Sequence, residues 1–89
     1  MVRRRYCFYG RVQGVGFRFT AGHAAAQLGL TGWVRNEYDG SVTLEVQGEE
    51  ALIRMLLERI HRDSYIEVDR MEMTELIPDP EERSFGKRW

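Results

Sequence analysis

The sequence of 89 residues contains one cysteine, two prolines and no long apolar run. Because Cys7 has no second cysteine to pair with, an internal disulfide is excluded, which suits a reducing cytoplasm. No apolar stretch approaches the length of a membrane span, and no signal-type apolar core follows the N-terminal residues. We therefore expect a cytoplasmic protein that has no membrane partner and is stabilised by packing alone.

The sequence also lacks an excess of charge of either sign. Its formal net charge at pH 7 is -1, which argues against a general nucleic-acid binder. The two histidines, His23 and His61, have no companion ligands at a useful spacing, so neither a metal nor another cofactor is predicted. A chain of 89 residues is long enough for one hydrophobic core but not for two, and we expect a single domain over residues 1–89.

Glycine is concentrated where an apolar run ends and an alanine-rich run begins, in Gly10-Arg11-Val12-Gln13-Gly14-Val15-Gly16-Phe17-Arg18. Gly14 and Gly16 let the backbone turn tightly and expose consecutive N–H groups. A helix that starts at or just after Arg18 adds its leading N–H groups to the same hollow. The guanidinium of Arg18 is a planar fork that can hold two phosphate oxygens.

Two commoner glycine motifs do not fit this stretch. A dinucleotide fingerprint needs a third glycine where Phe19 stands, and a Walker A loop needs a terminal Gly-Lys-Ser/Thr. A plain glycine turn whose arginine pairs locally remains an alternative. We interpret the loop as an anion cradle made by Gly14, Val15, Gly16, Phe17 and Arg18.

The same stretch resembles the signature of the acylphosphatase family, and Gly32-Trp33-Val34-Arg35-Asn36 resembles its second signature. The resemblance is strongest from Gly10 to Gly48. It implies hydrolysis of the carboxyl–phosphate bond of acyl phosphates on a ferredoxin-like βαββαβ fold. Carried over by position, it implies that Arg18 binds phosphate and that Asn36 orients the attacking water.

Hydrophobic periodicity predicts two helices and four or five strands, and the resemblance implies that they form an α+β sandwich with both helices on one face of an antiparallel sheet. The expected helices span residues 19–28, ended by Gly29, and 50–61. The expected strands span 6–12, 30–36, 41–47, 66–76 with a bulge near Asp69, and 84–89. The central strands should be 6–12 and 41–47, with the strand before Asn36 at one edge. The predicted core is Tyr6, Phe8, Phe17, Leu28, Val42, Leu44, Ile53, Leu56, Leu57 and Ile60.

The strand–helix–strand crossover predicts why distant residues share a site. It makes the first two strands parallel, so that their carboxyl ends lie at one edge of the sheet. Arg18 follows the first strand and Asn36 ends the second. We therefore expect the two side chains to meet.

Other conspicuous residues are interpreted as structural. Residues 3–5, three arginines at a strand entry, are expected to be a solvated end. Cys7 and Trp33 are expected to pack, Cys7 buried and Trp33 partly buried. The resemblance implies a last strand of alternating apolar residues that ends in an aromatic residue. Phe85 and Trp89 fit this pattern, whereas Lys87 stands where an apolar side chain is expected, which puts the packing of this strand in question.

The predicted reaction is direct attack of a positioned water on an acyl phosphate, without a metal, in a monomer that inorganic phosphate inhibits. Nothing comparable to the cradle is evident for the acyl group, so several acyl groups should be accepted. One alternative is a binding module for nucleic acid or a small molecule, although Tyr9 and Trp33 offer little of the aromatic surface that RNA binding needs. A second is an acylphosphatase-like module of a larger carbamoyl-transfer enzyme; the short chain favours an independent enzyme.

Overall fold

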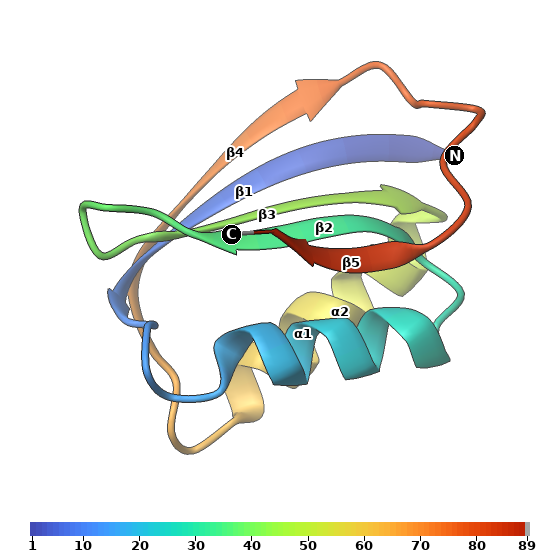
Figure 1. Ribbon diagram of the computed structural model, residues 1–89. Coiled ribbons are helices and arrows are strands. Elements are labelled where there is room, and N and C mark those ends of the chain that lie inside the picture. Colours follow the sequence, from blue (N-terminus) through green and yellow to red (C-terminus); the bar gives the residue numbers. More distant parts are fainter. Residues whose placement is uncertain (89) are drawn as a thin grey trace.

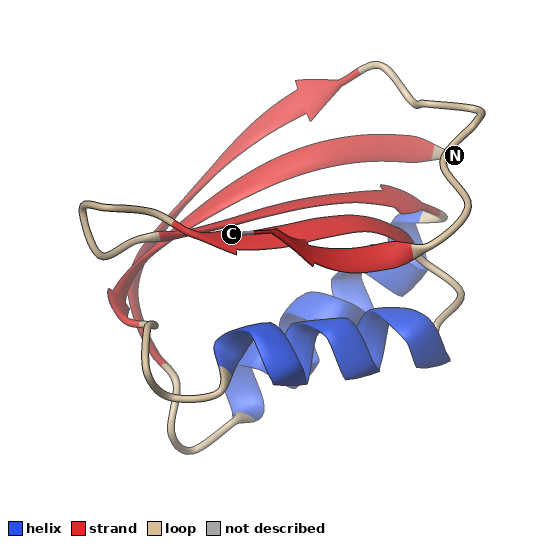
Figure 2. Cartoon of the chain, viewed as in Figure 1, coloured by secondary structure: helices blue, strands red, loops and turns tan. Residues whose placement is uncertain are grey.

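The computed structural model describes residues 1–88, in which two helices pack on one face of a five-stranded sheet (Figures 1 and 2). The sheet has the order β4-β1-β3-β2-β5. This architecture confirms the predicted ferredoxin-like α+β fold. The elements along the chain are β1 (Val2–Arg11), α1 (Phe17–Gln27), β2 (Thr31–Asn36), β3 (Val42–Gly48), α2 (Glu50–Arg62), β4 (Glu67–Leu76) and β5 (Phe85–Arg88).

The sheet is mixed, and the prediction of a purely antiparallel sheet with β2 at its edge is wrong. β5 pairs with β2 in parallel, from Gly32 opposite Phe85 to Arg35 opposite Arg88. The cause is the route of residues 77–84, which cross the end of the sheet where β4 finishes and β2 starts (Figure 1). β5 therefore enters the sheet from the end at which β2 begins. Trp89, expected at the end of this strand, lies outside the described residues.

The first helix begins at Phe17, earlier than the predicted start, because Gly16 already takes the N-cap position. Its other end follows the prediction. Gly29 has φ +70°, and its N–H donates to Ala26 while the N–H of Leu30 donates to Ala25 over 2.9 Å. This pair of bonds is a Schellman ending, which requires the left-handed conformation that glycine adopts at little cost.

The predicted bulge in β4 is confirmed at Asp69. Tyr9 of β1 pairs with Arg70 and Gly10 pairs with Val68, so Asp69 has no partner across the ladder. Gly10 has φ +132°, and a Cβ there would lie 2.3 Å from the carbonyl oxygen of Glu67. Only glycine fits opposite this bulge.

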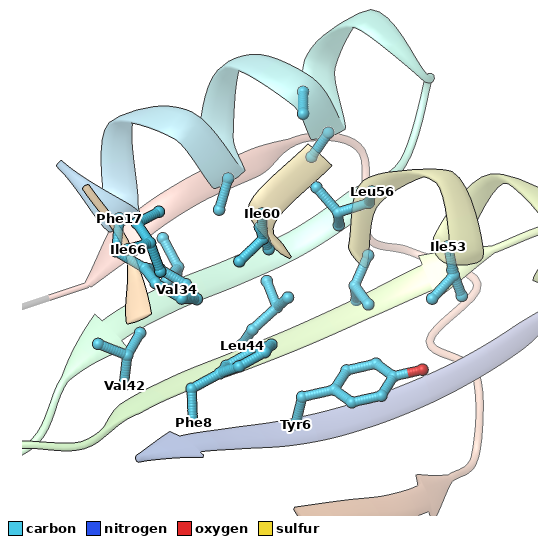
Figure 3. Close-up of a cluster of buried hydrophobic side chains, with 14 of the residues drawn as sticks. Tyr6, Phe8, Phe17, Val34, Val42, Leu44, Ile53, Leu56, Ile60 and Ile66 are labelled. Atoms are coloured by element: carbon cyan, nitrogen blue, oxygen red, sulfur yellow. The ribbon is translucent and has the colours of Figure 1, made fainter. Parts of the chain in front are cut away.

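The core lies between the sheet and the two helices (Figure 3). Eight of the ten predicted core residues are buried, whereas Leu28 and Leu57 are only partly buried because they lie on the flanks of their helices. The predicted list omitted three alanines of α1 and several β-branched residues that also belong to the core. The added members are Val12, Ala21, Ala24, Ala25, Leu30, Val34, Val46 and Ile66.

Arg3, on the face of the sheet away from the helices, does not form the solvated end that we expected. Arg3 is only 6% exposed, since its Nε donates to Glu45 over 3.0 Å and its terminal nitrogens donate to Glu82. These carboxylates raise the pKa of Arg3, chiefly through the hydrogen bond to Glu82. Gln47 exchanges two hydrogen bonds with the backbone of Asp79, at 2.7 and 2.8 Å. Residues 77–84 thus help to bury the face of β3 that lies away from the helices, and the solvated role predicted for Arg3 is wrong.

Two other structural interpretations can be compared with the fold. Trp33 is 9% exposed, and the guanidinium carbons of Arg35 and Arg88 lie over its ring, at 5.1 and 4.5 Å from the ring centroid. Its packing role is confirmed. Cys7 is half-buried in the middle of β1, with a free thiol. Neither helix of the described chain is long and apolar enough to cross a membrane.

Candidate active site

The loop between β1 and α1 has the backbone conformation that an anion cradle requires. Gly14 and Gly16 have φ +73° and +82°, and no atom lies within 4 Å of the position of a Cβ at either glycine. Glycine is therefore needed for its positive φ and not for lack of space. The first hydrogen bond of α1 runs from Thr20 N–H to the Gly16 carbonyl over 2.9 Å. The leading N–H groups of the helix consequently point toward the loop.

Arg18 and Asn36 line the same hollow, of about 250 Å³, which we call the phosphate hollow. Arg18 reaches it from the first turn of α1 and Asn36 from the last residue of β2. Both residues are half-buried, so each side chain is partly restrained by its neighbours and can still be reached from solvent. The hollow is lined by Val12, Gly14, Gly16, Phe17, Arg18, Phe19, Asn36 and Lys87.

Topology brings these residues together in the way that the crossover predicts. β1 and β2 both pair antiparallel to β3, so they run parallel to each other. Their carboxyl ends, the glycine loop and the hairpin after Asn36 all lie at the left end of the sheet in Figure 1. Val15 is the exception among the predicted cradle residues, because it does not line the hollow and packs partly buried against the core.

Gln13 connects the glycine loop to the hairpin that follows Asn36. Its Nε2 donates to the carbonyl oxygens of Glu37 and Ser41, over 2.7 and 2.9 Å. These bonds fix the distance between the cradle and Asn36. The sequence analysis gave Gln13 no role, and the available signal was its place inside the first signature.

The hairpin itself is held by two ionised carboxylates. Glu37 accepts hydrogen bonds from Thr43 Oγ1 over 2.6 Å and from Arg35 Nε over 3.1 Å, which lower its pKa, with Thr43 as the larger cause. Asp39 accepts from the hydroxyl and N–H of Ser41, and these bonds lower its pKa as well. Both carboxylates are therefore ionised at neutral pH and hydrogen-bonded within the hairpin that directly follows Asn36.

Lys87 is the site residue that the sequence analysis missed. It was treated as a packing problem in the last strand, whereas the structure places it, exposed, on the wall of the phosphate hollow. It reaches the site because β5 lies beside β2, with Lys87 opposite Val34. No sequence signal gave that parallel pairing.

The charges in the hollow are suited to an anion. Arg18 and Lys87 are cationic, and none of the described residues that line the hollow is acidic. Within residues 1–88 there is no group of three His, Cys, Asp or Glu side chains placed to hold a metal ion. His23 instead stacks on Phe19, and His61 Nδ1 lies 2.8 Å from the Leu57 carbonyl oxygen.

The fold is an α+β sandwich in which a glycine loop, an arginine and an amide line one small hollow. These features are typical of a class of proteins that bind a phosphoryl group. The family model described as Acylphosphatase matches residues 4–87. The acylphosphatase of Geobacillus thermodenitrificans is 42% identical over 77 residues, which cover 85% of this chain and 82% of that relative. The crystal structure of acylphosphatase from Bacillus subtilis has a TM-score of 0.91 at 30% identity and covers both chains fully.

The chain belongs to the acylphosphatase family. It is an enzyme that hydrolyses acyl phosphates, as the two signatures predicted, and the alternative of a binding module is not favoured. Full-length HypF in its phosphate- and nucleotide-bound form is also similar, with a TM-score of 0.87 at 29% identity. That match covers 99% of this chain and 12% of HypF, so the fold also occurs as a segment of a longer chain.

Proposed function

We propose that the chain hydrolyses acyl phosphates by direct, in-line attack of one water on phosphorus. The guanidinium of Arg18 and the N–H groups of residues 14–18 hold the phosphoryl oxygens, and the side-chain amide of Asn36 orients the water. The observation that carries this proposal is that Arg18 and Asn36, from separate elements, line one hollow.

The chemistry requires little beyond positioning and positive charge. The water oxygen bonds to phosphorus, the bond from phosphorus to the carboxyl oxygen breaks, and both hydrogens of the water leave with the phosphate product. Because a carboxylate is a good leaving group, no acid has to protonate it. Charge stabilisation and alignment can then lower most of the barrier.

The cradle supplies its positive charge from the chain itself, so we expect turnover without a metal. The test is hydrolysis of benzoyl phosphate by purified protein with and without a strong chelator. Equal rates are expected, and inorganic phosphate should inhibit competitively because it shares the end of the substrate that the cradle holds. Activity that the chelator abolishes would contradict this mechanism.

We infer further that residues 1–89 form one domain and act as a monomer in the cytoplasm, without a nucleic-acid partner. The lone, half-buried Cys7 supports a reducing compartment, and the net charge of -1 opposes binding to nucleic acid. Light scattering during size-exclusion chromatography measures the oligomeric state directly. A dimer at micromolar concentration would contradict the monomer.

A further inference from the structure

A second hollow adjoins the phosphate hollow between α1 and β5. Its volume is about 270 Å³, and we call it the side hollow. Two residues, Phe19 and Lys87, line both hollows, so the two spaces are contiguous. The full lining of the side hollow is Phe19, Gly22, His23, Phe85, Gly86 and Lys87.

The side hollow has a flat wall and a cationic rim. The ring of Phe19, 66% exposed, stacks on His23 with centroids 5.9 Å apart and planes 5° apart. Gly22 and Gly86 carry no side chains that would fill the space. Phe85 closes the inner end, since it packs partly buried against the core.

Lys87 places a positive charge on this rim. It lies opposite buried Val34, so its side chain leaves β5 on the face that the helices cover. Its neighbour Arg88 lies on the other face, over Trp33. Lys87 forms no ion pair with another residue of the described chain, and no residue lining either of its hollows is acidic.

In-line geometry points the acyl group toward the side hollow. The attacking water and the leaving carboxylate lie on opposite sides of phosphorus. Since Asn36 orients the water, the acyl group has to leave on the side away from Asn36. A third hollow, beside the hairpin, includes Asn36 and the carboxylate of Glu37, whereas the side hollow includes neither.

We propose that the side hollow is the acyl subsite and that Lys87 makes the enzyme prefer acyl phosphates whose acyl group carries a second negative charge, such as a carboxylate. This inference rests on the proposed function, because it assumes that the phosphoryl group occupies the phosphate hollow. Lys87 acts as a specificity-determining residue for the acyl end. This proposal differs from the expectation that nothing comparable to the cradle recognises the acyl group.

Two substrates of nearly equal shape test the preference, 4-carboxybenzoyl phosphate and its neutral counterpart 4-carbamoylbenzoyl phosphate. The rigid ring prevents the carboxylate from attacking its own acyl phosphate. For one solvent-accessible charge pair we expect kcat/KM to be about threefold to tenfold higher for the carboxylate substrate at low ionic strength. Added salt should reduce this ratio because it screens exposed charges.

Substitutions assign the preference to Lys87. Lys87→Met removes the charge and keeps the length of the stem, so the ratio of the two kcat/KM values should fall to about one. Lys87→Arg should retain the ratio. The matched control is Arg88→Met, which removes one positive charge from the same strand on the opposite face, and it should leave the ratio unchanged.

Three results would overturn the proposal. The first is a wild-type enzyme that cleaves both substrates equally well, which would leave hydrolysis itself intact. The second is a Lys87→Met variant in which both substrates and phosphate inhibition weaken by one common factor, since Lys87 would then hold the phosphoryl group. The third is a wild-type protein that cleaves neither compound, which would also contradict the proposed function.

Discussion

At the scale of single residues, Arg18 and Asn36 share a hollow but differ in charge, so their removal should have different effects. Arg18→Gln removes a charge that acts both on bound phosphate and on the transition state. We expect weaker phosphate inhibition together with lower turnover. Asn36→Ala should lower kcat by about 10²–10³-fold, as the loss of one positioned polar group does elsewhere, while phosphate still binds.

Steady-state kinetics with benzoyl phosphate and the inhibition constant of phosphate separate the two roles. The assigned role of Asn36 is wrong if Asn36→Ala binds phosphate far more weakly yet turns over normally. Circular dichroism of both variants controls for folding.

Gln13 should act as a positioning residue through its two hydrogen bonds to the hairpin. Gln13→Ala leaves two carbonyl acceptors without this donor and should lower the free energy of unfolding by about 1–3 kcal/mol. Because the hairpin then moves relative to the cradle, kcat should fall while the inhibition constant of phosphate stays unchanged. Tyr38→Ala is the control, since Tyr38 is fully exposed on the same hairpin. A loss of stability without any loss of kcat would limit Gln13 to a structural role.

The placement of Arg18 and Asn36 in one hollow could be predicted from the sequence because it depends on local information. Arg18 and Asn36 each stand in a contiguous signature, and the crossover rule brought them together without knowledge of side-chain contacts. Gln13 and Lys87 were missed because their roles depend on partners far away in the sequence. Gln13 meets carbonyl groups of residues 37 and 41, and Lys87 reaches the site only through the pairing of β5 with β2.

At the scale of elements, α2 offers the clearest test of packing. Leu56 is fully buried in the core, whereas Leu57, the next residue, is only partly buried. Leu56→Ala should lower the free energy of unfolding by about 2–5 kcal/mol, because it removes buried methyl groups and leaves a cavity. Leu57→Ala should cost less, about 1–2 kcal/mol. Urea denaturation measures both, and equal losses would contradict the assigned face of the helix.

Features of the helices and strands that depend on neighbouring residues could be predicted from short sequence patterns. The slip of hydrophobic alternation in β4 predicted the bulge at Asp69, and Gly29 predicted the end of α1. Both are local effects of backbone geometry. The partner and direction of β5 follow instead from the route of residues 77–84 across the end of the sheet, and that route depends on contacts such as those of Gln47 with Asp79.

At the scale of the whole molecule, Arg3 joins β1, β3 and the segment before β5. Its side chain is 7% exposed and pairs with Glu45 and Glu82, whose side chains are 11% and 16% exposed. Arg3→Met removes the charge that these two carboxylates share and should lower the free energy of unfolding by about 3–5 kcal/mol. Arg5 also pairs with Glu45, but its side chain is 49% exposed. Arg5→Met should therefore lower the free energy of unfolding by less than about 1 kcal/mol. Similar losses of stability in the Arg3→Met and Arg5→Met variants would contradict a buried network.

The central claim is that the whole site works by positioning and charge, without an acid for the leaving group. Among residues 1–88, none that lines the phosphate hollow has a side-chain carboxyl or imidazole group. A phosphate monoester fits the cradle, but its departing alkoxide or phenoxide needs a proton far more than a carboxylate does. The most direct measurement compares kcat/KM for acetyl phosphate, benzoyl phosphate and phenyl phosphate under one set of conditions. The account predicts turnover of both acyl phosphates and negligible turnover of phenyl phosphate; comparable turnover of phenyl phosphate would require a general acid and would contradict the mechanism.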